Sequence, residues 1–322
     1  MRSAQTDDSF PLASVKPLER LLQYRAHCVA AVQDALRTGP MRRRDRSPVS
    51  NARLEPYGDI EGLAYARCPE SGSLFLVELP EARGWARLLA ELNQYRHSPD
   101  AFYSDIAQSR VDHVYAPKLE WIRETLRLQG IRRPRLLEGV TPPSHLTGLL
   151  SDSGLFEAIV TVDETALAGG TAQPTAPVQA AVLLESLDRV DDPVALLHGV
   201  REPLEDGGLL FVTALVCSGF DFAVLGLRNL YLYPPDRANC FSLEGLSTLM
   251  SRAGFALLEV STPGVLDVEV VLAHLRLDPS LPLSMFERQV VNADAETRAA
   301  FQAFLQQQGL SSFARLVARK EP

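Results

Sequence analysis

The sequence predicts an α/β protein with a mostly parallel central sheet flanked by helices. Between residues 135 and 275, short apolar segments typical of buried strands alternate with segments of helical periodicity. Strands separated by helices imply parallel neighbours joined by right-handed crossovers. The chain has 322 residues, of which 46% are hydrophobic, so it is long enough for this core and for additional regions at both ends.

The order of the elements follows from local patterns. The expected strands are 135–140, 156–162, 178–184, 209–214, 255–262 and 268–275. The expected helices between them are 145–151, 192–201 and 241–254, the last with Ser242 as its N-cap. Segment 164–177 contains small residues and proline with little helix signal, which predicts a loop.

Composition excludes several classes of protein. The net charge of −8 argues against a general nucleic-acid or anionic-membrane surface, and the arginine run at 41–46 is expected to be a solvated loop. The most apolar segment, 209–217, is about half the length of a membrane span. Residues 1–14 lack the apolar centre of a secretory signal, so we expect a cytoplasmic protein. The scattered cysteines are expected to be reduced thiols: Cys28, Cys68, Cys217 and Cys240.

Two short proline-containing segments precede the predicted α/β region. They read Ser47-Pro48-Val49-Ser50 and Cys68-Pro69-Glu70-Ser71-Gly72. With cysteine at all four ends, they would form the two knuckles of a zinc ribbon. Since hydroxyls are poor zinc ligands beside thiolate, no zinc is expected. The segments are either a remnant that persists as a small β element ending at 74–77, or turn sequences that recur by chance.

The segment 136–150 has the pattern of a strand, a tight loop and a helix start, where nucleotide-cofactor folds hold their ligand. Such loops favour glycine, because the backbone takes positive φ and approaches the ligand closely. Here the loop reads Val140-Thr141-Pro142-Pro143-Ser144. Each proline fixes its φ and removes a hydrogen-bond donor, which predicts that this loop binds a cofactor differently.

Five further motifs occur in a fixed order: LLESLDRVDDP at 183–193, LEDGGLL at 204–210, YPPDRANCFS at 233–242, TPGVLDV at 262–268 and LSSFARLVARK at 310–320. With these motifs, residues 134–275 resemble a class I S-adenosylmethionine (SAM) dependent methyltransferase. More narrowly, residues 45–320 resemble the methyltransferases that carry an N-terminal zinc ribbon and a C-terminal extension. The resemblance implies a Rossmann-like methyltransferase fold.

The regions expected on this basis are five. Residues 1–45 form an N-terminal helix and basic loop, 46–80 a degenerate zinc-ribbon-like element, and 81–130 a helical linker. Residues 131–278 form the methyltransferase-like α/β domain and 279–322 a C-terminal helix and strand extension. Segment 220–233 is either a core-packing helix or a lid, ligand wall or interface.

The resemblance also implies where SAM would lie. Asp163 would accept hydrogen bonds from the ribose hydroxyls, and Glu138 would order the first loop. Leu184 and Glu185 would pass beside the adenosine and methionine parts. The full set of expected cofactor-binding residues is Glu138, Gly139, Thr141, Asp163, Leu184 and Glu185; no catalytic residue is assigned.

The departures from the resembled family are systematic. Its "D-x-G-x-G-x-G" loop becomes EGVTPPS at 138–144, so all three matching glycine positions are replaced. Its "LEHL" histidine becomes Arg189, the histidine often found after "PPD" becomes Arg237, and the one after "SS" becomes Phe313. Three of the four zinc-cysteine positions hold serine.

We therefore predict a methyltransferase-like pseudoenzyme that has lost normal SAM binding and acts as a scaffold or partner subunit. The expected partner is a protein, either an active relative or a second copy of this chain, and neither nucleic acid nor membrane. The alternative is an active SAM-dependent methyltransferase that acts on a small molecule through an atypical loop. A third class is a binding module for another small ligand in the same cleft.

Overall fold

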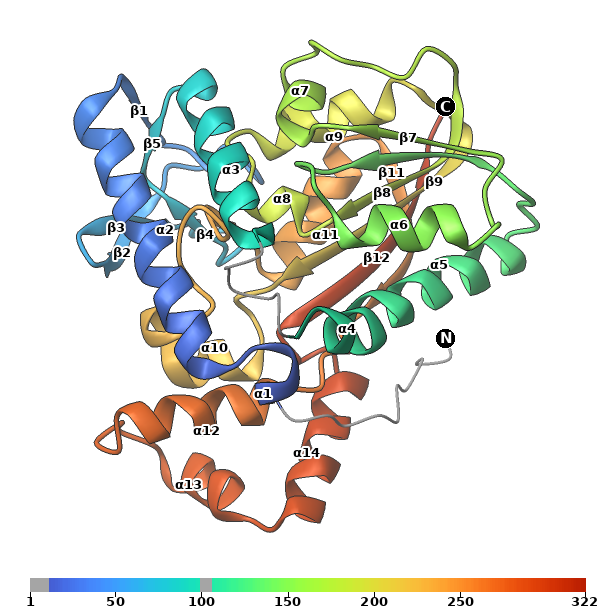
Figure 1. Cartoon of the computed structure of the whole chain (residues 1–322). Coiled ribbons are helices and arrows are strands. Elements are labelled where there is room, and N and C mark those ends of the chain that lie inside the picture. Colours follow the sequence, from blue (N-terminus) through green and yellow to red (C-terminus); the bar gives the residue numbers. More distant parts are fainter. Residues whose placement is uncertain (1–11, 99–105) are drawn as a thin grey trace.

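A six-stranded sheet forms the centre of the computed structural model, which describes residues 12–98 and 106–322 (Figure 1). Its order is β11-β12-β9-β8-β6-β7. The neighbours β7 (Ala158–Val162), β6 (Arg135–Gly139), β8 (Val178–Leu184) and β9 (Leu204–Leu215) run parallel. The last two strands, β12 (Phe313–Lys320) and β11 (Phe255–Ser261), pair antiparallel. The predicted α/β class with a mostly parallel sheet is confirmed.

Helices cover both faces of the sheet. On one face, α5 (Ala116–Leu128) and α6 (His145–Asp152) pack Trp121, Ile122 and Leu150 against strand residues such as Phe211. On the other, α9 (Pro193–Arg201) and α11 (Leu243–Arg252) bury their apolar faces against β8 and β9. The side chain of Ser242 caps α11 by accepting a hydrogen bond from the Gly245 amide, as expected.

Two element predictions were wrong. Segment 268–275 was expected to be a strand but lies in α12 (Asp267–Leu277), and the C-terminal β12 takes the place in the sheet. The valines of α12 favour a strand locally, but they are buried in a helical cluster with α10 (Phe220–Leu225). The expected loop 164–177 begins with α7 (Glu164–Ala168), because the Asp163 side chain caps its first amides.

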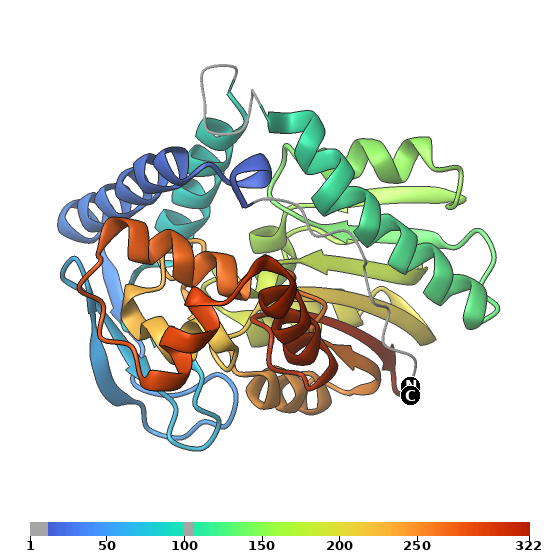
Figure 2. The same cartoon turned by 90° about the horizontal axis from the view of Figure 1, so that it is seen from below.

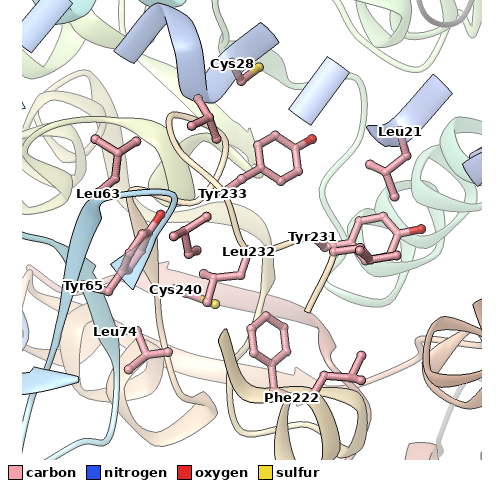
Figure 3. Packing of buried hydrophobic residues seen from close by; sticks show 14 of the residues in the cluster. Leu21, Cys28, Leu63, Tyr65, Leu74, Phe222, Tyr231, Leu232, Tyr233 and Cys240 are labelled. Carbon is pink, nitrogen blue, oxygen red and sulfur yellow. The ribbon is translucent and has the colours of Figure 1, made fainter. Parts of the chain in front are cut away.

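The N-terminal region combines helices with two small sheets. The helices are α1 (Leu12–Val15), α2 (Leu18–Thr38) and α3 (Ala82–His97). One sheet pairs β1 (Met41–Arg43) with β5 (Glu78–Pro80); the other has the order β10-β4-β3-β2, formed by Asn239–Cys240, Leu74–Leu76, Leu63–Arg67 and Glu55–Ile60. Because β10 comes from the α/β region, the two regions share a sheet. Tyr65 and Leu74 pack with Leu232, Tyr233 and Cys240 (Figure 3).

The four positions of the proline-containing segments converge around one sulfur atom. The Ser50 hydroxyl lies 3.4 Å from Cys68 Sγ. Burial raises the pKa of the Cys68 thiol, but hydrogen bonds from Ser47, Ser50 and Ser71 outweigh burial and lower the pKa to about 7. Among the described residues, no group of three or more His, Cys, Asp or Glu side chains could hold a metal ion. That the element is a zinc-ribbon remnant stays a prediction.

Further helical elements lie before and between the strands of the sheet along the chain. α4 (Ala107–Arg110) and the π-helical turn η2 (Val111–Tyr115) lead into α5. α10 continues into η3 (Gly226–Arg228), and α12 packs with α13 (Met285–Asn292) and α14 (Ala295–Gln307) to form a lobe at one end of the molecule (Figures 1 and 2). No helix within the described ranges has the length and apolar character needed to cross a membrane. Most of the segment that lacks a secretory signal lies outside these ranges.

Candidate functional site: a cleft at the switch point of the sheet

A cavity of about 350 Å³ lies beyond the carboxyl ends of β6 and β8. The strand order reverses there, since β6 has β7 on one side and β8 on the other, and α/β folds bind ligands at such a crevice. Glu138, Gly139 and Leu184 line the cavity from the sheet, while Tyr115 and Lys118 line it from η2 and α5. The cavity therefore lies at the end of the sheet where the sequence predicts a ligand site.

Glu138 ties the first loop to its neighbours. Its residue is 2% exposed, and its carboxylate accepts hydrogen bonds from the hydroxyls of Ser144 at 3.2 Å, Thr147 at 2.7 Å and Thr161 at 3.3 Å. Burial raises the pKa of Glu138, while these hydroxyls act against the rise. Ser144 also caps α6 by accepting from the Leu146 amide. Glu138 thus holds the first loop through these hydroxyls, and its role toward SAM stays a prediction.

Asn93 of α3 holds the loop from the other side. Its Nδ2 donates to the carbonyl oxygens of Thr141, at 2.8 Å, and Pro143, at 3.0 Å. The loop residues Val140 and Ser144 line the cavity without filling it. Asn93 could not be predicted from the sequence, because helical periodicity identifies an apolar face and not a polar contact made across the fold.

Asp163 does not line the cavity. Its Oδ1 accepts from the amides of Thr165, at 2.9 Å, and Ala166, at 3.2 Å, as the N-cap of α7. The next residue, Glu164, is fully buried and lies 3.0 Å from the Arg189 guanidinium. Burial raises the pKa of Glu164, and Arg189 acts in the opposite direction.

The Arg189–Glu164 pair joins the end of β7 to the short helix α8 (Ser186–Arg189) that follows β8. The Thr141 hydroxyl donates to the same Glu164 carboxylate at 2.9 Å, so the pair also holds the loop. These contacts bridge the strand ends where the adenosine of SAM is expected, and the loop beside them offers two prolines in place of backbone donors. Arg189 lines the cavity from this pair, whereas Glu164 lies behind it.

Glu185 is engaged by cations at the end of β8. Its carboxylate lies 3.4 Å from Lys118 Nζ and 2.8 Å from the Arg237 guanidinium. Burial raises the pKa of Glu185, but Lys118 and Arg237 outweigh it and hold that pKa well below its usual value. Its backbone is left-handed, with φ of 62°, a conformation that persists in a non-glycine residue only where its surroundings fix it.

The three positions at which the resembled family carries histidine converge on this cavity. Arg189, Arg237 and Phe313 all line it, although they lie far apart in the sequence. His145 also lines it, with its ring centroid 4.8 Å from that of His97. Burial lowers the pKa of His97 to about 4, so this imidazole is neutral at pH 7. The cations Lys118 and Arg315, which the sequence did not single out, share the cavity.

Comparison with known proteins adds a family match. Residues 120–260 match the family model of a methyltransferase domain. No curated protein sequence matches the chain. The matched segment includes the loop, the switch point and α11, and the fold is accordingly a Rossmann-like methyltransferase fold with additional N-terminal elements.

Several solved structures are distantly similar. The 1,6-didemethyltoxoflavin-N1-methyltransferase of Burkholderia thailandensis is 12% identical, with a TM-score of 0.41, over 83% of this chain and 100% of its own. The plantazolicin methyltransferase BamL is 11% identical, with a TM-score of 0.44, over 75% and 98%. The [4+2]-cyclase SpnF is 19% identical, with a TM-score of 0.32, over 59% and 75%. Such distant likenesses transfer neither substrate nor activity.

The chain is therefore methyltransferase-like. The family match supports the alternative of an active small-molecule methyltransferase more directly than it supports a pseudoenzyme, since the model describes a methyltransferase domain. The six expected cofactor residues keep the status of predictions: five of them line the cavity, and Asp163 does not.

Proposed function

We propose that this protein acts by binding a protein partner and not by catalysis. It has a methyltransferase fold whose cleft no longer holds SAM in the usual manner. The observation that carries the proposal is the buried ion pair of Arg189 and Glu164, 3.0 Å apart. It bridges the strand ends at the place of the adenosine, and breaking it to admit a cofactor would leave a buried carboxylate without its counter-charge.

Two further contacts support the proposal. The carboxylate of Asp163 caps α7 by accepting hydrogen bonds from backbone amides, so it is not turned toward a ribose. Glu185, at the end of β8, is already paired with Lys118 and Arg237. A cofactor would have to replace these internal contacts with equally good ones before any net affinity remained.

The second candidate is an active SAM-dependent methyltransferase of a small molecule. The match of residues 120–260 to a methyltransferase domain favours it, as does the cavity at the switch point. Methyl transfer depends mainly on binding and in-line placement of two substrates, so the missing histidines alone would not exclude it.

Calorimetric titration of the full chain with SAM and with S-adenosylhomocysteine separates the two candidates. We expect no binding at ligand concentrations approaching about 1 mM, since several lost contacts of about 1–3 kcal/mol each abolish useful affinity. A cooperative thermal transition in the same sample shows that the protein is folded. Micromolar binding of either compound would refute the proposal and establish the second candidate as the one to pursue.

A protein partner remains part of the proposal, as an active relative or a second copy of this chain. Light scattering on the purified chain tests the second copy directly. A monomer at every concentration would leave a heteromeric partner as the remaining form of this proposal.

A further inference from the structure

Arg315 is a buried cation that forms no ion pair with any described residue. It lies on β12, lines the cavity, and is 7% exposed. No side-chain hydrogen bond or ion pair joins its guanidinium to another described residue, and its Nε is buried without a partner. Its guanidinium lies over the Trp121 ring, 5.4 Å from the ring centroid. A buried guanidinium is costly unless an anion accompanies it.

Lys118 places a second positive charge on the same wall. It is 3% exposed and lies on α5, one helical turn before Trp121. Its Nζ lies 5.3 Å from the ring centroid of Phe313, which is two residues before Arg315 on the same face of β12. The two contacts cross between the same helix and strand, so α5 and β12 bring both cations to one side of the cavity.

The internal acids on this side do not supply the missing anion. Glu185, which pairs with Lys118, also pairs with Arg237. Glu259 acts on Arg315 from β11 without forming an ion pair, and its Oε1 accepts a hydrogen bond from the Ser261 hydroxyl at 3.0 Å. Arg315 therefore has no ion-pair partner among the described residues, although Glu259 acts on it from a distance.

The two aspartates near the start of β12 are satisfied by their own neighbours. Asp267 accepts from the Ser312 amide at 2.7 Å and from the Ser311 hydroxyl, and Asp221 accepts from Asn229 Nδ2 at 2.9 Å. Burial and the neighbouring Asp267 raise the pKa of Asp221 to about 7. Burial thus reduces the negative charge that these two aspartates place on this side of the cavity.

We propose that Arg315 and Lys118 bind the oxyanion, a carboxylate or a phosphate, of a small ligand in this cavity. A guanidinium offers a planar fork of donors that matches both groups, and an ammonium adds a point charge. The apolar part of the ligand would lie against Tyr115, Leu184 and Phe313. The inference rests on the proposed function in one respect, that the cleft does not hold SAM in the usual manner.

The experiment titrates the full chain with benzoate and, separately, with inorganic phosphate, by calorimetry and by thermal shift. The variants are Arg315→Met and Lys118→Met. The matched control is Arg319→Gln, because Arg319 lies on the same face of β12, outside the cavity, and donates to Gln129 Oε1 at 2.6 Å. Benzoate alone binding indicates a carboxylate ligand, and phosphate alone a phosphate ligand.

We expect the favoured anion to raise the melting temperature of the wild-type chain in a saturable way. Arg315→Met should weaken this binding about tenfold or more, and Arg319→Gln should leave it unchanged. Without any anion, Arg315→Met should melt at or above the wild-type temperature, since it removes an unpaired buried charge. An arginine with a purely structural role would give the opposite result.

The inference is overturned if neither anion binds the folded wild-type chain, or if Arg315→Met binds as tightly as the wild type. If Arg315→Met fails to fold, Lys118→Met and Arg315→Lys carry the same comparison. Failure of the proposed function would look different: SAM or S-adenosylhomocysteine would bind at micromolar concentration, whatever the response to benzoate or phosphate.

Discussion

The guanidinium of Arg189 and the carboxylate of Glu164 lie 3.0 Å apart and connect the ends of two strands that are not neighbours in the sheet. The strand between them, β6, carries the first loop, and the Thr141 hydroxyl of that loop joins the pair. One ion pair therefore shapes the cofactor side of the cleft and also fixes its loop.

Breaking this pair from one side should be more costly than removing both charges. We expect Arg189→Met to lower the free energy of unfolding by about 3–5 kcal/mol, because the buried Glu164 loses its counter-charge. In the double variant Arg189→Met/Glu164→Gln, the loss should be smaller than the sum of the single losses by about 1–3 kcal/mol. Urea unfolding of the four proteins measures this interaction energy.

The control for this cycle is an exposed pair. Arg87 and Glu91 lie 3.8 Å apart on α3, with both side chains largely exposed. Arg87→Ala should leave the unfolding midpoint unchanged, since exposed ion pairs contribute little. Additive effects of Arg189→Met and Glu164→Gln would show that the two residues do not act as a pair.

Asn93 of α3 should stabilise the first loop. Asn93→Ala removes both hydrogen bonds to the loop carbonyls, and we expect a loss of stability of about 1–3 kcal/mol. Hydrogen exchange of the amides of Thr141 and of residues 144–147 should accelerate at the same time. Unchanged exchange there would mean that Glu138 and the cap of α6 hold the loop without Asn93.

Asp188 should make stability fall as pH rises. Burial raises the pKa of Asp188 to about 8, although Arg237 acts against the rise. An unfolded aspartate has a pKa of about 4, so between about pH 4 and pH 8 the folded chain binds one more proton than the unfolded chain. Each pH unit in this window should reduce stability by up to about 1.4 kcal/mol.

Asp188→Asn should remove this dependence, because its amide imitates the protonated carboxyl and its Oδ1 can still accept from the Leu215 amide. The measurement is urea unfolding of wild type and variant from pH 5 to pH 8. Parallel stability curves for the two proteins would mean that Asp188 is already ionised in the folded chain at pH 5.

The cluster around Cys68 offers a test of its origin. If the four positions keep the geometry of two zinc knuckles, the variant Ser47→Cys/Ser50→Cys/Ser71→Cys should bind one Zn²⁺ through four thiolates. Cobalt substitution should give thiolate charge-transfer bands, and zinc should raise the melting temperature. Adding Cys68→Ser should weaken both effects. A folded triple variant that binds no metal would favour the chance recurrence of two turns.

The sequence by itself determined the local elements of the α/β region. The apolar segment Val178–Leu184 forms a strand over its whole predicted length, and Ser242 caps its helix as expected. Both features depend on residues close together in the chain, where side-chain periodicity and capping chemistry act directly. It also located the cleft, because a ligand site in such a sheet follows from strand order.

Only the tertiary structure decided what the cleft contains. Segment 268–275 has the composition of a strand, yet it is helical and packs with α10, and the C-terminal β12 pairs with β11 instead. Arg189 meets Glu164, and Arg315 meets Trp121, across 25 and 194 residues of sequence. Such contacts leave no periodic signal, because they depend on which strands become neighbours and which helix crosses them, and not on any local preference of the chain.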